Sequence, residues 1–242
     1  MNTGVSHEGH RQRLKNRFLA EGLDRFEAHN ILELLLFYAI PQKDTNELAH
    51  ALLDRFGSLK GVFDADISEL VKVKGIKENA ATLIKLIPQL SRAYMVSECA
   101  DVEVFDTIGT IGEFFVRKYI GETKEVVYLM LLDNGFKLID AIKLHTGSVN
   151  SAKITPRMII DEVIKHNASM IVIAHNHPNG LAIPSMEDIE TTTQLCSTLR
   201  IFDVIMIEHI LVAGSEYYPL LHETGIDRFK TEEHKKLFRK YK

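Results

Sequence analysis

The sequence predicts an α+β chain of two domains, an all-helical domain over residues 1–95 and a mixed α/β domain over residues 110–225. Two observations support this division. Apolar residues recur at helical spacing through the first 95 residues, and from residue 110 apolar strand-like runs alternate with helical patterns. We expect residues 96–109 to form a linker and residues 226–242 a basic tail. With 242 residues and 45% hydrophobic content, the chain can bury one large core or two smaller ones.

Three helices are expected at the start of the N-terminal domain. Apolar spacing predicts helices over residues 10–20 and 24–38, and Pro41 ends the second because proline interrupts a helix. Thr45 is a suitable N-cap for the third helix. Gly57 ends that helix, since glycine readily adopts the left-handed conformation that follows a helix.

A short helix begins at residues 66–69, and residues 70–84 form two short helices around a tight turn at Gly75. This segment resembles a helix-hairpin-helix, a module whose backbone N–H groups bind a DNA phosphate. Such hairpins have a second glycine where this chain has Lys77, and Ala81 is the small residue that follows. The resemblance makes Gly75 and Lys77 the candidate nucleic-acid-binding residues. The alternative is that the hairpin only packs helices together.

The C-terminal domain alternates helices and strands in an order that predicts a mixed sheet flanked by helices. Helices are expected over residues 111–120, 156–166 and 185–199. Strands are expected over residues 125–132, 136–144, 169–174, 204–212 and 216–218. The tripeptide at residues 133–135 is a tight hairpin signal between the first two strands. Pro156 suits the first turn of its helix.

A candidate metal centre follows the apolar run of residues 170–174, which leads into His175 and His177. Residues two apart on a strand point the same way, so the two imidazoles face one side. Asp188 lies in the first turn of the next helix. Two histidines and one carboxylate with an open position are the ligand set of a catalytic zinc site. We therefore expect one Zn²⁺ per chain, held by His175, His177 and Asp188.

Ser185 and Asp188 also have a structural interpretation. Prolines at both ends of the loop over residues 178–184 stiffen it and reduce the entropy lost on ordering. Ser185 stands at a helix start with Asp188 three residues later, as in a capping box. Its hydroxyl can cap the helix while it orders the site, so the two roles are compatible. Asp188 can likewise serve the helix dipole instead of a metal.

These residues resemble the JAMM motif of MPN-domain metalloproteases, which cleave peptide or isopeptide bonds. The resemblance rests on residues 173–180 and 184–189. Together with the helical hairpin domain, the chain is similar to the bacterial RadC family from about Glu8 to the end of the last strand. This resemblance implies that the C-terminal domain has an MPN fold and that His175, His177 and Asp188 hold zinc. It also implies that Ser185 assists the oxyanion.

A glutamate at the start of the first core strand is also found in the active proteases, and Glu125 occupies the matching position. The resemblance therefore implies that Glu125 is the general base. Glu162 and Glu208 are its competitors. We expect Glu162 to face water on a helix, whereas Glu208 or its neighbour His209 can reach the residues around the ligands.

The leading functional hypothesis is a zinc metallopeptidase that attacks an amide of a peptide or protein substrate with metal-activated water. The second is a DNA-associated repair or recombination factor, in which the hairpin binds DNA and the metal domain is accessory or silent. The third is a metal-binding scaffold without turnover.

The composition indicates a globular protein without membrane-spanning segments. A net charge of −4 with 26% charged residues is ordinary for a globular protein. The longest apolar stretch, residues 34–40, is too short to span a bilayer, so we expect no membrane partner. The two cysteines, Cys99 and Cys196, are isolated, which favours a reducing cytoplasm over an oxidising compartment.

Overall fold

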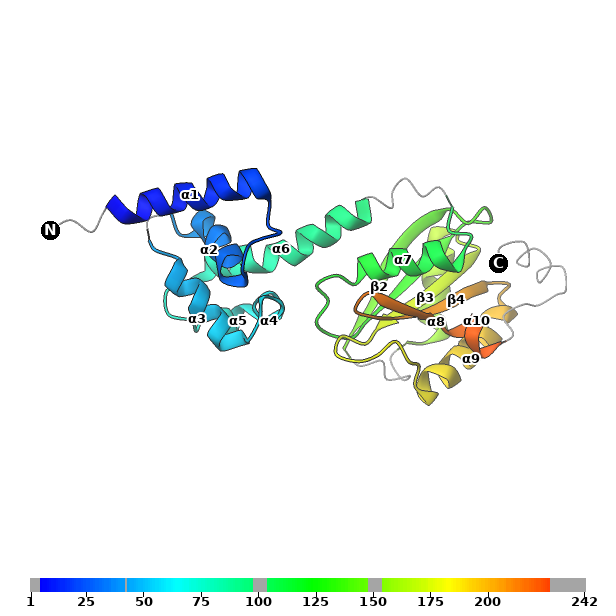
Figure 1. Cartoon of the computed structure of the whole chain (residues 1–242). Coiled ribbons are helices and arrows are strands. Elements are labelled where there is room, and N and C mark those ends of the chain that lie inside the picture. Colours follow the sequence, from blue (N-terminus) through cyan, green and yellow to red (C-terminus); the bar gives the residue numbers. More distant parts are fainter. Residues whose placement is uncertain (1–4, 42, 98–103, 148–153, 227–242) are drawn as a thin grey trace. The chain divides into compact units, whose positions relative to one another are not determined.

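The computed structural model describes residues 5–41, 43–97, 104–147 and 154–226 (Figure 1). The chain divides into two compact units, Met1–Ser91 and Arg92–Lys242. The expected linker over residues 96–109 lies partly outside the described residues, and the expected tail over residues 226–242 lies outside them except for residue 226. Among the described residues, no helix has the length and apolar character needed to cross a membrane.

The first unit is helical, as expected, but the two short helices expected over residues 70–84 are not both present. Residues 71–77 form turns around Gly75, and one long helix of 20 residues follows them. The helices of this unit are α1 (Val5–Glu21), α2 (Ala28–Ala39), α3 (Asn46–Phe56), α4 (Leu59–Asp64), α5 (Ile67–Leu70) and α6 (Glu78–Ser97), the last of which continues beyond Ser91. Leucine and isoleucine side chains from α2, α3 and α6, including Leu32, Leu52 and Ile84, are fully buried in a shared core. These helices therefore depend on a common apolar centre more than on their individual propensities.

The residues next to the helix ends in this unit determine how α3 ends and how α4 begins. Gly57 adopts the left-handed conformation (φ 79°) at the end of α3, as expected. Thr45 precedes α3, but its side chain makes no capping hydrogen bond, and its hydroxyl donates instead to the carbonyl of Glu33 at 3.2 Å. The sequence patterns did not indicate α4, which Ser58 caps by accepting the N–H of Gly61 at 3.0 Å.

The second unit contains a five-stranded mixed sheet, as expected. Its strands are β1 (Val126–Leu132), β2 (Leu138–Thr146), β3 (Met170–Asn176), β4 (Ile205–Ala213) and β5 (Glu216–Pro219), and its helices are α7 (Ile108–Lys118), α8 (Pro156–His166), α9 (Met186–Ile201) and α10 (Leu220–Thr224). The strand order is β2-β1-β3-β4-β5, and every pair is antiparallel except the parallel pair β3–β4.

Helices cover both faces of this sheet (Figure 1). Phe114 and Phe115 of α7 pack on the face that includes Met130. On the opposite face, α8 and α9 pack against β1 and β3, with Ile159 and Leu195 among the buried contacts. All residues of β1 and β3 are buried, which explains why these strands are continuous apolar runs in the sequence.

The pairing of the strands brings several chain segments to one end of the sheet. His175 of β3 lies opposite Val127 on one side and Leu211 on the other. Because β1 runs antiparallel and β4 parallel to β3, the start of β1 meets the ends of β3 and β4 here. The end of β3 extends further than expected, so that His175 itself belongs to the strand.

Gly112 allows α7 to approach β5 closely. An added Cβ would lie 2.4 Å from the ring of Tyr217, a distance that forces either the helix or the ring to move. We therefore expect Gly112→Ala to destabilise the protein by about 1–3 kcal/mol, measured by urea unfolding. Gly109→Ala on the same helix is the control, since its Cβ would meet only ordinary contacts at 3.7 Å. Equal unfolding free energies for the two variants would contradict this packing argument.

Candidate metal centre

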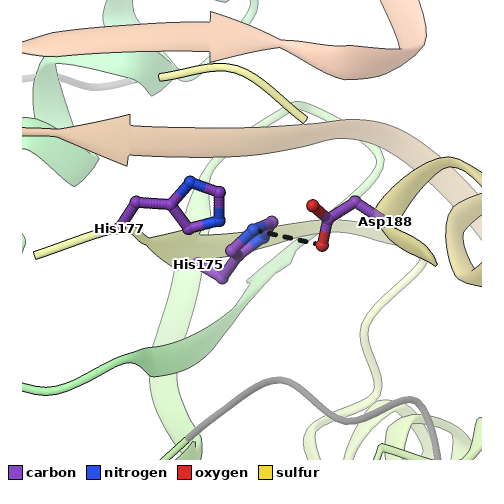
Figure 2. Close-up of side chains that lie close together, drawn as sticks. All are labelled: His175, His177 and Asp188. Atoms are coloured by element: carbon purple, nitrogen blue, oxygen red, sulfur yellow. Dashed lines mark ion pairs between the residues drawn. The ribbon is translucent and has the colours of Figure 1, made fainter. Parts of the chain in front are cut away.

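Three side chains converge at the end of β3 (Figure 2). Ligand atoms of His175, His177 and Asp188 all lie within 4.8 Å of one another. Nε2 of His175 lies 3.3 Å from Oδ1 of Asp188. His175 and Asp188 are only 1% and 6% exposed. The structure thus brings the three expected ligands together as a possible metal-binding group, while the identity of the metal stays a prediction.

The hydrogen bonds of the two histidines leave one nitrogen of each available. Nδ1 of His177 lies 3.1 Å from the carbonyl of Leu181, which can only accept, so Nδ1 carries the proton and Nε2 keeps its lone pair. Nε2 of His175 is buried and has no hydrogen-bond partner. An unsatisfied buried polar atom is costly, and a metal ion at this position would satisfy it. The donor set and its geometry therefore fit a bound metal.

Ser185 orients Asp188 at the start of α9. Oδ2 of Asp188 accepts from the backbone N–H of Ser185 at 2.8 Å and from its hydroxyl at 2.6 Å. In return, the Ser185 hydroxyl oxygen accepts the N–H of Asp188 at 3.1 Å, which completes the capping box. The structure therefore shows Ser185 as an N-cap that holds one carboxylate oxygen, while the other oxygen faces His175.

A second set of buried polar groups lies next to Nδ1 of His175, the ring nitrogen that does not face Asp188. Its Nδ1 is 2.8 Å from Nε2 of His209, and Nδ1 of His209 is 2.6 Å from the hydroxyl of Thr192. Thr192 in turn donates to the carbonyl of Asp188 at 2.5 Å. Burial, followed by the proximity of His209, lowers the pKa of His175 to about 3, although Asp188 opposes the shift. Burial also lowers the pKa of His209 to about 4, so both rings are neutral at pH 7.

Glu125, the expected base, directly precedes β1 and is partly buried. Its backbone is held by Asn176, whose amide accepts from the N–H of Val126 at 2.7 Å and donates to the carbonyl of Lys124 at 3.1 Å. The N–H of Gly147 donates to the carbonyl of Glu125 at 2.7 Å. Asn176 stands between the two histidines, so one short segment carries two ligands and fixes the chain on both sides of Glu125. The sequence patterns gave no sign of this contact.

The two competing glutamates have other partners. Both carboxylate oxygens of Glu208 accept backbone N–H groups, from His209 and Leu221 at 2.8 and 2.6 Å and from His222 at 3.1 Å. Glu208 thus accepts N–H groups at the start of α10, whereas its neighbour His209 contacts the candidate ligand His175. Glu162 on α8 pairs with Lys165 and His166.

The candidate nucleic-acid residues lie in the first unit. Gly75 has a φ of +99°, and an added Cβ would lie 2.7 Å from a methyl group of Leu48. This glycine is therefore needed for the turn and for its packing, whatever else it does. Lys77 is exposed immediately before α6. Phosphate binding by these residues stays a prediction.

Comparisons with known proteins show the family to which the chain belongs. The RadC-like JAB domain family matches residues 105–226, the region that holds the mixed sheet and the group of His175, His177 and Asp188. The UPF0758 N-terminal family matches residues 6–82. A UPF0758 protein of Fusobacterium nucleatum subsp. nucleatum is 34% identical over 223 residues, or 89% of this chain and 96% of the relative. The chain therefore belongs to the RadC-like JAB family, which confirms the resemblance drawn from its motifs.

The lowered pKa of the buried histidines predicts how stability depends on pH. Below about pH 6.5 the unfolded chain binds protons on these rings that the folded, metal-free protein does not bind until pH 4 or lower. Stability therefore falls as the pH drops from about 6.5 to 4, on the order of 3 kcal/mol for His209 alone. Urea unfolding at several pH values in the presence of a chelator measures this loss.

Two variants make this measurement specific. His209→Gln removes one of the buried rings and should lose less unfolding free energy between pH 7 and pH 5 than the unaltered protein. His222→Gln alters an exposed ring and should follow the unaltered protein. The same acid-induced loss in all three proteins would show that His209 does not titrate as described.

Proposed function

We propose that this protein is a zinc-dependent hydrolase, a JAMM-type metallopeptidase that cleaves a peptide or isopeptide bond in a protein or peptide substrate. The observation that carries the proposal is the convergence of His175, His177 and Asp188 within 4.8 Å, with Nε2 of His175 buried and without a hydrogen-bond partner. Membership of the RadC-like JAB family supports it, since JAB/MPN domains often include metalloproteases.

The ligand chemistry favours zinc and a catalytic role. Two imidazole nitrogens and one carboxylate oxygen suit zinc, and three protein ligands leave one position for water or substrate. A zinc ion bound here would polarise a carbonyl and lower the pKa of a bound water towards neutrality. His175, His177 and Asp188 would hold it. A structural zinc site would use a fourth protein ligand, and the group found in the described residues has three.

Glu125 would accept the proton of the attacking water and pass it to the amine of the leaving group when the C–N bond breaks. Two features support this role. Glu125 lies two residues before Val127, which pairs with His175, so its backbone lies at the same end of the sheet as the candidate ligands. The contacts of Asn176 and Gly147 to the backbone around Glu125 would restrict its position during the reaction.

Ser185 has two successive roles in this proposal. In the structure its hydroxyl donates to Oδ2 of Asp188 at 2.6 Å and so orients that carboxylate towards the metal position. To assist the oxyanion of the tetrahedral intermediate, the hydroxyl must turn its proton from Asp188 to the substrate. The backbone N–H of Ser185 would keep Oδ2 in place during this exchange, because it donates to the same oxygen at 2.8 Å.

The ligand assignment predicts the metal content of a variant. Purified protein should contain about one zinc per chain, and His177→Ala should lose it, because two remaining ligands bind zinc weakly. His177 is partly exposed, so its removal leaves the buried core intact. Elemental analysis after dialysis measures the content, with His222→Ala as a control outside the site. A full zinc complement in His177→Ala would refute the ligand set.

The base assignment predicts a variant that binds metal but does not turn over. Glu125→Gln keeps the shape of the side chain but cannot accept the proton, so hydrolysis should fall by about 10²–10⁴-fold with zinc content unchanged. Cleavage of a proteome-derived peptide mixture, followed by mass spectrometry, provides the readout. Glu162→Gln is the matched control, because Glu162 pairs with Lys165 on α8. Unchanged cleavage by Glu125→Gln would exclude Glu125 as the base.

A further inference from the structure

Four buried residues form a continuous hydrogen-bonded path beside the metal ligands. The path runs from the ring of His175 to His209, then to the hydroxyl of Thr192, and ends at the main-chain carbonyl of Asp188, with distances of 2.8, 2.6 and 2.5 Å. None of the four residues is more than 6% exposed. They come from β3, β4 and α9, so the path joins two metal ligands across three elements.

The direction of each hydrogen bond follows from the last group in the path. The carbonyl oxygen of Asp188 can only accept, so Thr192 gives its single hydroxyl proton to that oxygen. With this proton committed, the Thr192 oxygen can act towards His209 only as an acceptor. Nδ1 of His209 must therefore carry a proton and donate it to Thr192.

The same argument extends to the metal ligand. A neutral imidazole carries one proton, and burial keeps His209 neutral because a charged ring would lose its hydration. Since the proton of His209 is on Nδ1, its Nε2 has a free lone pair and accepts a hydrogen bond from the Nδ1–H of His175. Nε2 of His175 then keeps its lone pair on the side of Asp188, where the metal would lie. A main-chain carbonyl thus sets the tautomer of a ligand three hydrogen bonds away.

We propose that His209 and Thr192 are positioning residues that fix the tautomer of His175 and so keep its Nε2 ready to bind a metal. This inference rests on the proposed metal site. The competing explanation is that the path only satisfies buried polar groups. The two explanations differ in one respect, because a purely structural path affects the stability of the protein but not its affinity for zinc.

Thr192→Val tests the proposal with little change of shape. Without the hydroxyl, Nδ1 of His209 has no acceptor there, and its proton can move to Nε2. The His175 proton would then be displaced to the nitrogen that must bind the metal. The zinc dissociation constant, measured by competition with a chromophoric chelator, should rise about 10- to 100-fold. Thr192→Ser keeps the hydroxyl and should bind zinc as the unaltered protein does.

Thr193→Val is the matched control. Thr193 is the next residue on α9, is exposed, and makes the same kind of hydrogen bond to the carbonyl four residues earlier, Ile189, at 2.8 Å. It should bind zinc with unchanged affinity. If the Thr192→Val and Thr193→Val variants bind zinc equally tightly, the positioning role is overturned. If instead the unaltered protein binds no more zinc than His177→Ala, the metal site itself fails, and the positioning role fails with it.

The tautomers can also be observed directly. Long-range ¹H–¹⁵N correlation spectra of the zinc-loaded protein should show Nδ1–H on both His175 and His209. A proton on Nε2 of His209 would overturn the proposal. This spectrum needs no substitution in the path, so it can still refute the proposal if Thr192→Val fails to fold, as circular dichroism would reveal.

Discussion

The candidate metal centre depends on the pairing of β3 between β1 and β4. This pairing buries the apolar part of β3 on both faces and leaves its polar residues at one end of the sheet. β1, on one side, brings Val127 opposite His175 and so brings Glu125 to the same end. β4, on the other side, runs parallel and brings His209 within 2.8 Å of His175. A one-residue slip of either pairing would reverse which side chains face the ligands.

Without a metal, burial of the polar groups at this candidate site lowers the stability of the protein. His175, His209, Thr192 and Asp188 are all withdrawn from water at the edge of an apolar core. Hydrogen bonds satisfy Nδ1 of His175 and both nitrogens of His209, but Nε2 of His175 has no such partner. A divalent ion would satisfy this atom and compensate the carboxylate at the same time, so metal affinity and stability of this domain are linked.

Much of the fold could be predicted from the sequence, because apolar periodicity reports which face of an element is buried. The boundaries of α8 agree with those expected, and β1, β3 and β4 differ by one or two residues. The candidate ligands could also be found in the sequence, since His175 and His177 are near neighbours and their spacing is local.

The rest of the site depends on contacts that periodicity does not report. Alternation alone turns the side chain of Asn176 away from the ligands, and its partner Val126 is 50 residues distant in the chain. Thr192 looks like any threonine on a helix until the register of β3 with β4 places His209 beside it. Glu208, a candidate base by residue type, instead binds the N–H groups that start α10.

The start of α9 shows how one residue can serve both the fold and the metal. An aspartate three residues after an N-cap reaches back to the cap with one oxygen, and here Oδ2 accepts both the N–H and the hydroxyl of Ser185. Oδ1 stays directed at His175, so capping and metal binding use different atoms and do not compete. The capping box also anchors the ligand to the helix whose next turn carries Thr192. The helix start therefore sets where Asp188 points, and through Thr192 it also sets which nitrogen of His175 is free.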